Sequence, residues 1–131
     1  MSTARILVVD DDDAVRGVVK AVLERAGYQI VTASNGPDAI ALVRAQAVDL
    51  VLLDIEMPGM NGFDVCGLLR ADPVLRAIPV MMMTGRPIIG VLEKVQAVGA
   101  VEFIPKPFDR HSLLEKVRMH LLSRANGNPL G

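Results

Sequence analysis

Three short runs of consecutive apolar residues, at positions 6–9, 50–53 and 80–83, constrain the fold of this chain more than any other feature. None of them alternates with polar residues, so a strand formed by any of these runs is apolar on both faces. Strands of this kind lie in parallel sheets that helices cover above and below. Residues 28–33 and 101–105 are weaker strand candidates.

The segments between these runs show helical periodicity. In the first segment, apolar residues follow the i, i+3, i+4, i+7 rule from Val15 to Ala26, and Gly27 provides a stop signal. The spacing predicts helices over residues 15–26, 37–45, 62–70, 87–98 and 112–123, with Asp109 as a cap of the last one. This alternation predicts an α/β fold with a doubly wound, five-stranded parallel sheet and five helices.

Size and charge limit the kinds of protein that this sequence can encode. With 131 residues there is room for one domain, expected at residues 1–124, followed by a flexible tail or linker start at 125–131. Fourteen Lys and Arg residues oppose fifteen Asp and Glu residues, which argues against direct nucleic-acid binding. No apolar stretch is long enough for a membrane span, and a single cysteine fits a reducing compartment. We therefore expect a cytoplasmic protein that contacts neither nucleic acid nor membrane.

Chemically active residues follow four of the five predicted strands. Asp10 and Asp11 end the first strand, Asp54 the third, Thr84 the fourth and Lys106 the fifth. Because doubly wound sheets bind ligands outside the carboxyl ends of their strands, these side chains are expected to form one site. Three converging carboxylates repel one another unless a cation lies between them, and oxygen donors suit Mg²⁺. A lysine and a hydroxyl suit the oxygens of a transferred phosphoryl group.

Four sequence blocks surround these residues in a fixed order: VVDD at 8–11, LDIEMPGMNG at 53–62, MTG at 83–85 and KPF at 106–108. Together they resemble the receiver domain of two-component response regulators, over about residues 5–122. The resemblance implies a flavodoxin-like (βα)5 fold and a role in phosphorelay signal transduction rather than a turnover enzyme. It also implies a phosphohistidine donor, on a sensor histidine kinase or a histidine phosphotransfer protein.

The resemblance assigns roles to the acidic residues. It implies that Asp54 accepts the phosphoryl group, in a Mg²⁺-dependent (or Mn²⁺-dependent) reaction that the domain promotes itself. Asp11 and Asp54 are implied to bind the metal directly, together with the backbone carbonyl of Glu56. Asp10 is implied to act on the metal mainly through water.

The remaining motif residues are assigned in the same way. Thr84 and Lys106 are implied to contact the phosphoryl oxygens. Phe103 occupies the position of an aromatic switch, whose rotamer follows Thr84 when the site is loaded. The Lys106–Pro107 peptide bond is implied to be cis, which an X-Pro bond adopts at modest cost.

Two further expectations concern regulation. The face built from helix 87–98, strand 101–105 and helix 112–123 is implied to contact an output partner or a second receiver. As a separate hypothesis, Glu56 and Arg86 pair across the mouth of the site and slow hydrolysis of the acyl phosphate, because their charges are opposite.

Two other functions match parts of the pattern. A phosphorylation-independent pseudo-receiver would use the same fold as an interaction domain, although such domains usually lack part of the set of residues that is complete here. A haloacid-dehalogenase-like phosphatase with Asp10 as nucleophile would account for the first aspartates, Thr84 and Lys106. That second alternative leaves Asp54 and the turn at residues 58–62 unexplained.

Several other residues receive structural interpretations. Asp12 and Asp13 are expected in the first turn of a helix, where the helix dipole favours negative charge, rather than on a metal. Cys66 is expected in the core as a small apolar residue. His111 and His120, distant in sequence from the carboxylates, are expected on the surface.

Overall fold

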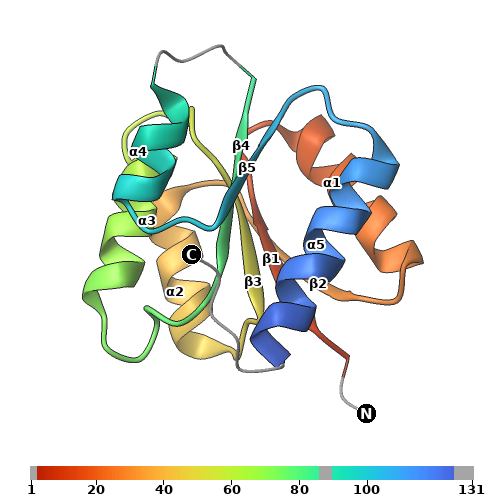
Figure 1. Cartoon of the computed structure of the whole chain (residues 1–131), viewed down its shortest axis with the longest axis horizontal. Helices are drawn as coiled ribbons and strands as arrows, with labels where there is room; N and C mark the ends of the chain where they lie inside the picture. The colour runs from red at the N-terminus through yellow and green to blue at the C-terminus, as the bar shows by residue number, and fades with distance from the viewer. Residues whose placement is uncertain (1–2, 86–89, 126–131) are drawn as a thin grey trace.

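A sheet of five parallel strands forms the centre of the computed structural model, which describes residues 3–85 and 90–125. The elements in chain order are β1 (Arg5–Val9), α1 (Asp13–Arg25), β2 (Gln29–Ala33), α2 (Gly36–Ala45), β3 (Leu50–Asp54), α3 (Gly62–Ala71), β4 (Val80–Thr84), α4 (Val91–Ala97), β5 (Glu102–Pro105) and α5 (Arg110–Ala125). The strand order is β2-β1-β3-β4-β5. Helices α2, α3 and α4 lie against one face of the sheet, and α1 and α5 lie against the other (Figure 1). The predicted doubly wound, flavodoxin-like fold is confirmed.

Both faces of the sheet are buried, as the uninterrupted apolar runs predict. Alternate side chains of β1 and β3 enter two separate clusters. Leu7 and Leu53 pack toward α2 and α3, whereas Ile6 and Leu52 pack toward α1 and α5. Full burial of one such side chain stabilises the fold by about 1.5–3 kcal/mol. The methionines of β4 are all fully buried and fill space in both layers of the core.

Polar caps fix where the helices begin. The Asp12 carboxylate accepts hydrogen bonds from the backbone N–H groups of Ala14 and Val15 and caps α1. Asp13 then lies in the first turn of α1, as predicted. Asp109 caps α5, as predicted, because its Oδ1 accepts a hydrogen bond of 2.8 Å from the backbone N–H of Ser112.

Helix α4 is shorter at its start than the sequence predicts. The predicted helix covered residues 87–98, but Gly90 has a left-handed φ of 71° and directly precedes α4. A residue in that conformation cannot continue a right-handed helix, so the prediction is wrong at Gly90. The predicted start at Pro87, and the apolar residues Ile88 and Ile89, lie outside the described residues.

His120 corrects a second expectation. Its side chain is buried, with 3% of the residue exposed, whereas His111 is exposed as predicted. His120 shares the buried stripe of α5 with Leu113 and Val117, at the spacing of a helix face that packs on the sheet. Its Nε2 lies 3.4 Å from the carboxylate of Glu102 on β5. Glu102 on β5 therefore provides a polar partner for one nitrogen of a ring that lies within an otherwise apolar layer.

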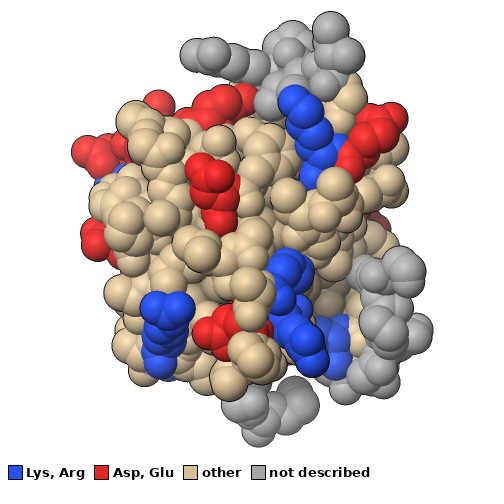
Figure 2. All heavy atoms as spheres, turned by 90° about the vertical axis from the view of Figure 1, so that its left-hand side faces the viewer, with Lys and Arg blue, Asp and Glu red and all other residues tan. Residues whose placement is uncertain are grey.

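The outer surface mixes charges of both signs. Figure 2, which views the side of the molecule formed by α2, α3 and α4, shows basic and acidic side chains separated by uncharged surface. The described part of this face therefore carries no extended field of one sign. Within residues 3–85 and 90–125, no helix combines the length and the apolar character that a bilayer crossing requires.

Candidate functional site

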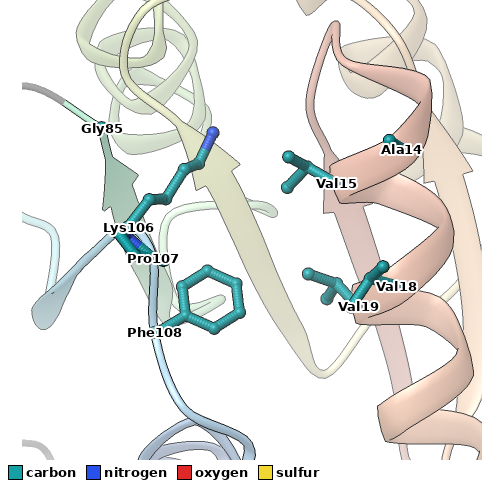
Figure 3. A pocket seen from close by; sticks show the side chains of 8 residues that line it. All are labelled: Ala14, Val15, Val18, Val19, Gly85, Lys106, Pro107 and Phe108. Atoms are coloured by element: carbon teal, nitrogen blue, oxygen red, sulfur yellow. The ribbon is translucent and has the colours of Figure 1, made fainter.

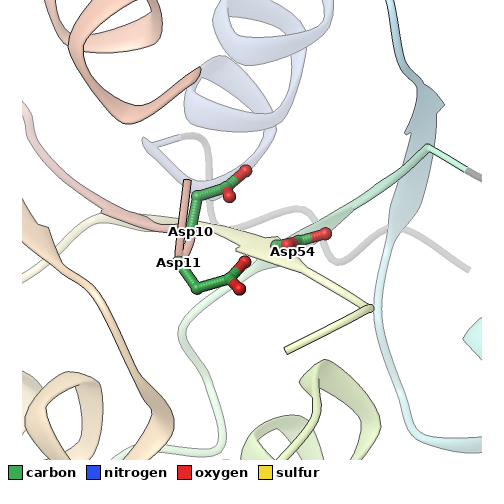
Figure 4. Close-up of side chains that lie close together, drawn as sticks. All are labelled: Asp10, Asp11 and Asp54. Carbon is green, nitrogen blue, oxygen red and sulfur yellow. The ribbon is translucent and has the colours of Figure 1, made fainter. Parts of the chain in front are cut away.

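Three aspartates meet where β1 and β3 end. Asp10 and Asp11 follow β1, and Asp54 is the last residue of β3. These strands are neighbours at the centre of the sheet, and the helices that follow them leave toward opposite faces. Such a topological switch point is where doubly wound folds bind ligands. One carboxylate oxygen from each aspartate lies within 4.8 Å of the others, and Figure 4 shows the side chains gathered above the strand ends.

Local hydrogen bonds hold the first of these aspartates in place. Asp10 is fully buried, and its Oδ1 accepts a hydrogen bond of 2.9 Å from the backbone N–H of Asp12. The Arg16 guanidinium donates to the backbone carbonyl of Asp10 at 2.7 Å. Because the chain turns from β1 directly into capped α1, the side chains of Asp10 and Asp11 both remain at the sheet edge.

The turn after β3 leaves no room for a side chain at Gly62. A Cβ atom on Gly62 would lie 2.5 Å from the backbone oxygen of Asp54. The backbone N–H of Gly62 also donates to the carbonyl of Ile55 at 3.0 Å, so the turn closes back on the end of the strand. The backbone N–H of Glu56 lies 3.3 Å from Oδ1 of Asp54. This close approach of two backbones fixes the position of the Asp54 carboxylate.

Lys106 reaches this cluster from the far end of the chain. Its Nζ lies 2.7 Å from Oδ2 of Asp10 and 3.3 Å from Oδ1 of Asp54. The backbone N–H of Lys106 bonds to the carbonyl of Thr84, and the Lys106–Pro107 bond is cis, as predicted. One ammonium group does not balance three carboxylates, so the site keeps an excess of negative charge.

The acidity of the buried groups reflects this excess. Burial, together with the charge of Asp10, raises the pKa of Asp54 from its ordinary 3.8 to about 7, although Lys106 opposes the rise. Burial alone would lower the pKa of Lys106, but its hydrogen bond to Asp10 and the charges of Asp54 and Asp10 raise it overall. The lysine therefore stays cationic, whereas ionisation of Asp54 costs free energy in the folded protein.

The carboxylates provide a set of donors that fits a hard divalent cation. All their donor atoms are oxygens, and Mg²⁺ prefers oxygen ligands, of which one or two are usually carboxylates. Asp10 and Asp54 are buried, whereas Asp11 is exposed and open to solvent. A cation there would offset the repulsion that raises the pKa of Asp54. The residues present therefore fit the metal that the sequence predicted.

Thr84 lies at the end of β4, and its hydroxyl contacts the side chain of Glu56, for which the sequence predicted a different partner. Its Oγ1 donates a 2.8 Å hydrogen bond to Oε1 of Glu56, and the backbone N–H of Gly85 lies 3.4 Å from Oε2 of the same carboxylate. The hypothesis instead paired Glu56 with Arg86, which lies outside the described residues. The sequence therefore predicted that Glu56 belongs to this site, through its backbone carbonyl and its charge, but it did not predict that the side chain contacts Thr84.

Phe103 lies on β5, away from the aspartate cluster. Its partly buried ring packs on the apolar cluster between the sheet and α2, α3 and α4. The Lys116 ammonium on α5 lies 3.4 Å from the Phe103 carbonyl oxygen and 3.4 Å from the Glu102 carboxylate. The predicted switch residue therefore lies within the predicted partner face, between α4 and α5.

An apolar hollow opens beside Lys106. It lies between α1 and the segment that follows β5, and Figure 3 shows the side chains that line it. Val15 and Val18 contribute from α1, and Pro107 and Phe108 contribute from the opposite side. Val18 is 60% exposed, whereas the other valines of α1 pack in or against the core.

Comparisons with known proteins agree with this geometry. The family model described as "Response regulator receiver domain" matches residues 6–118. The response regulator PleD of Caulobacter vibrioides is 42% identical over 118 residues, which are 88% of this chain and 26% of PleD. Protein PilH of Pseudomonas aeruginosa is 40% identical over 116 residues, which are 87% of this chain and 94% of PilH.

Solved structures give the same result. The crystal structure of a response regulator receiver domain protein (CheY-like) from Methanospirillum hungatei has a TM-score of 0.90 and 28% identity, and the match covers 97% of this chain and 100% of that one. The family model covers most of the chain, and PilH is matched over nearly its whole length. The chain therefore belongs to the family of response regulator receiver domains.

Proposed function

We propose that this domain accepts a phosphoryl group on Asp54 from a phosphohistidine donor and passes the signal on as a change of its partner-binding face. Receiver domains are signalling modules that work with histidine kinases, so the donor is a sensor histidine kinase or a histidine phosphotransfer protein. One observation carries the proposal: Asp54 lies in a cluster of three carboxylates, with the Lys106 ammonium 3.3 Å from its Oδ1.

The chemistry is a transfer between two nucleophiles. A carboxylate oxygen of Asp54 attacks phosphorus, the bond from phosphorus to the donor's imidazole nitrogen breaks, and its electron pair returns to the imidazole. Hydrolysis later transfers the phosphoryl group to water and regenerates the Asp54 carboxylate. Lys106 and Thr84 are proposed to bind the phosphoryl oxygens, because fixed cations and hydroxyl donors stabilise the charge spread over them.

We propose that Asp10, Asp11, Asp54 and the backbone carbonyl of Glu56 hold Mg²⁺ or Mn²⁺. An acidic triad of this kind is typical of the Mg²⁺ site of receiver domains. A bound divalent ion supplies positive charge that screens the carboxylates from the incoming phosphoryl group. Within this chain, buried Asp10 also orients Lys106 through its 2.7 Å contact.

The apolar hollow beside Lys106 is proposed as the place where the donor helix lies. Its lining by Val18, Pro107 and Phe108 offers apolar contact area next to the acceptor, and Lys106 belongs to both the hollow and the aspartate cluster. A helix that carries a phosphohistidine can therefore rest on Val18 while its imidazole reaches Asp54. Exposed apolar surface next to a reactive group is typical of such contact sites.

The output of the proposed switch is a shift between two conformations. Phosphoryl oxygens on Asp54 draw Thr84 and Lys106 inward, and Phe103 with the face formed by α4, β5 and α5 follows. An output partner or a second receiver responds only if it binds the two conformations with different affinity. Receiver domains are generally cytoplasmic, and we propose that location here.

Intact mass spectrometry tests the proposal directly. The wild type and Asp54→Asn are incubated with acetyl phosphate, each with and without Mg²⁺, after circular dichroism shows that both are folded. A phosphoryl adduct that requires Mg²⁺ and is lost in Asp54→Asn is the expected result. No adduct on the folded wild type would favour the pseudo-receiver alternative. An adduct that survives the substitution would favour Asp10 as nucleophile.

A further inference from the structure

We propose that the Glu56 carboxylate is a built-in occupant of the phosphoryl-binding position: it engages Thr84 and Gly85 in the unphosphorylated domain, and the phosphoryl group must displace it. The inference rests on the proposed function, because it concerns the same acceptor, Asp54. It differs from a pairing of Glu56 with Arg86, since Glu56 makes the contacts that carry it with Thr84 at the end of β4 and with Gly85, the next residue.

The contacts of Glu56 match those that a phosphoryl group would make. One carboxylate oxygen accepts the Thr84 hydroxyl at 2.8 Å, and the second lies 3.4 Å from the backbone N–H of Gly85. Thr84 is 4% exposed, so bulk water is not an alternative partner for its hydroxyl. If the hydroxyl leaves Glu56, its new acceptor is another protein oxygen or a phosphoryl oxygen. A carboxylate and a phosphoryl group both present several anionic oxygens to such donors. The two groups therefore compete for the same hydroxyl.

The position of Glu56 in the chain makes this contact easy to form. Glu56 follows Asp54 by two residues, and its own backbone N–H lies 3.3 Å from Oδ1 of Asp54. The backbone is thus anchored at the acceptor while the side chain extends to β4. Displacement then requires a rotation of the side chain alone, because the backbone of the turn is held by Gly62 against Asp54.

The charge of Glu56 acts in the same direction as its hydrogen bonds. Its charge is among the influences that raise the pKa of Asp54, after burial and Asp10, with Lys106 opposing them. The Glu56 charge is therefore felt at the acceptor carboxylate, and it would also repel an incoming phosphoryl group. Rotation of Glu56 away from Thr84 makes the Thr84 hydroxyl available to the phosphoryl group, and it also moves the repelling charge away.

The consequence is a threshold for activation. A site whose binding-competent form is only partly populated has an apparent affinity reduced by that fraction. As long as Glu56 holds Thr84, part of the binding energy of the phosphoryl group is spent on displacing the carboxylate. Removal of the side chain is therefore expected to strengthen the binding of phosphoryl analogues and to favour the switched conformation.

Two variants at one position separate occupancy from charge. Glu56→Ala removes both the acceptor oxygens and the charge, whereas Glu56→Gln removes the charge and keeps one oxygen that can accept from Thr84. Glu24→Gln on α1, whose side chain is half-exposed and paired with Lys20, is the control for loss of one surface charge. Thermal unfolding of each variant first establishes that it is folded.

The measurement is the affinity for beryllofluoride, a tetrahedral phosphoryl analogue, in the presence of Mg²⁺. Since a hydrogen bond to a charged group is lost on displacement, Glu56→Ala is expected to bind about tenfold more tightly than the wild type. Glu56→Gln is expected between the two, and Glu24→Gln is expected to equal the wild type. In the metal-free protein, the Gly85 amide resonance should shift upfield in Glu56→Ala, as its hydrogen bond is lost.

The outcomes distinguish this inference from the proposed function. If the wild type binds beryllofluoride and Glu56→Ala binds it no more tightly, Glu56 is not a competitor, while the phosphoacceptor assignment stands. If Glu56→Gln gains as much affinity as Glu56→Ala, repulsion alone accounts for the effect and the occupancy proposal is wrong. If the folded wild type binds no beryllofluoride and takes up no phosphoryl group, the proposed function fails and the inference fails with it.

Discussion

Replacement of Asp54 by asparagine is expected to stabilise the metal-free domain at neutral and alkaline pH while it abolishes phosphoryl uptake. Burial and Asp10 raise the pKa of Asp54 from 3.8 to about 7 in the folded protein. The shift is about three pKa units, and each unit corresponds to about 1.36 kcal/mol. The ionised Asp54 therefore destabilises the wild type by up to about 4 kcal/mol at pH 8, where the carboxylate is charged in both states. Asparagine has nearly the same shape and carries no charge, so Asp54→Asn removes this cost.

The sign of the pH dependence follows from the direction of the shift. Between the unfolded pKa of 3.8 and the folded pKa of about 7, the folded protein binds more protons than the unfolded chain. The contribution of Asp54 to the free energy of unfolding therefore rises as the pH falls through this window. The advantage of Asp54→Asn is expected to shrink from about 4 kcal/mol at pH 8 to about 2 kcal/mol at pH 5, and to vanish below about pH 4.

Urea denaturation followed by circular dichroism, in EDTA at pH 8, 6.5 and 5, measures these differences. Glu24→Gln is the control, because its exposed charge gives no comparable pH-dependent gain. Addition of Mg²⁺ should stabilise the wild type more than Asp54→Asn, since the variant lacks one anionic ligand. If Asp54→Asn is less stable than the wild type at pH 8 in EDTA, the idea that this site stores unfavourable charge is wrong.

Three further substitutions test how the site is built. Gly62→Ala places a Cβ atom 2.5 Å from the backbone oxygen of Asp54. We expect urea denaturation to show a free energy of unfolding lower by about 1–3 kcal/mol, and phosphoryl uptake from acetyl phosphate to be slower. Unchanged stability would show that the turn can relax. Arg70→Met loses hydrogen bonds to the carbonyls of residues 76, 78 and 99, each 2.9 Å, and should lower stability by about 1–3 kcal/mol, whereas exposed Arg118→Met should not. Val18→Asp, at an exposed position of the hollow, should slow phosphoryl transfer from a phosphohistidine protein about tenfold without affecting phosphoryl uptake from acetyl phosphate. Equal slowing of both reactions would rule out a docking role for the hollow.

The sequence did not predict contacts between side chains that come from distant segments of the chain. The spacing of residues 113, 117 and 120 is that of one helix face, yet His120 was expected at the surface because it is distant in sequence from the carboxylates. What accommodates it is Glu102, which another element supplies. In the same way, the sequence assigned the hydroxyl of Thr84 to the site. Its hydrogen bond to Glu56 was not predicted, because that contact depends on how the turn after β3 lies against β4.

The sequence by itself determined the class of fold and the residues of the site. The uninterrupted apolar runs require strands buried on both faces, the helical periodicity between them requires crossovers, and the polar residues Asp10, Asp54 and Lys106 stand where those strands end. These are local patterns, which the chain carries whatever its tertiary structure. Only the tertiary structure decided that Lys106 lies 2.7 Å from an aspartate 96 residues earlier, because the order of strands and the packing of helices bring their ends together. Burial of that cluster then sets its charge and its pKa, since desolvation depends on every neighbour at once.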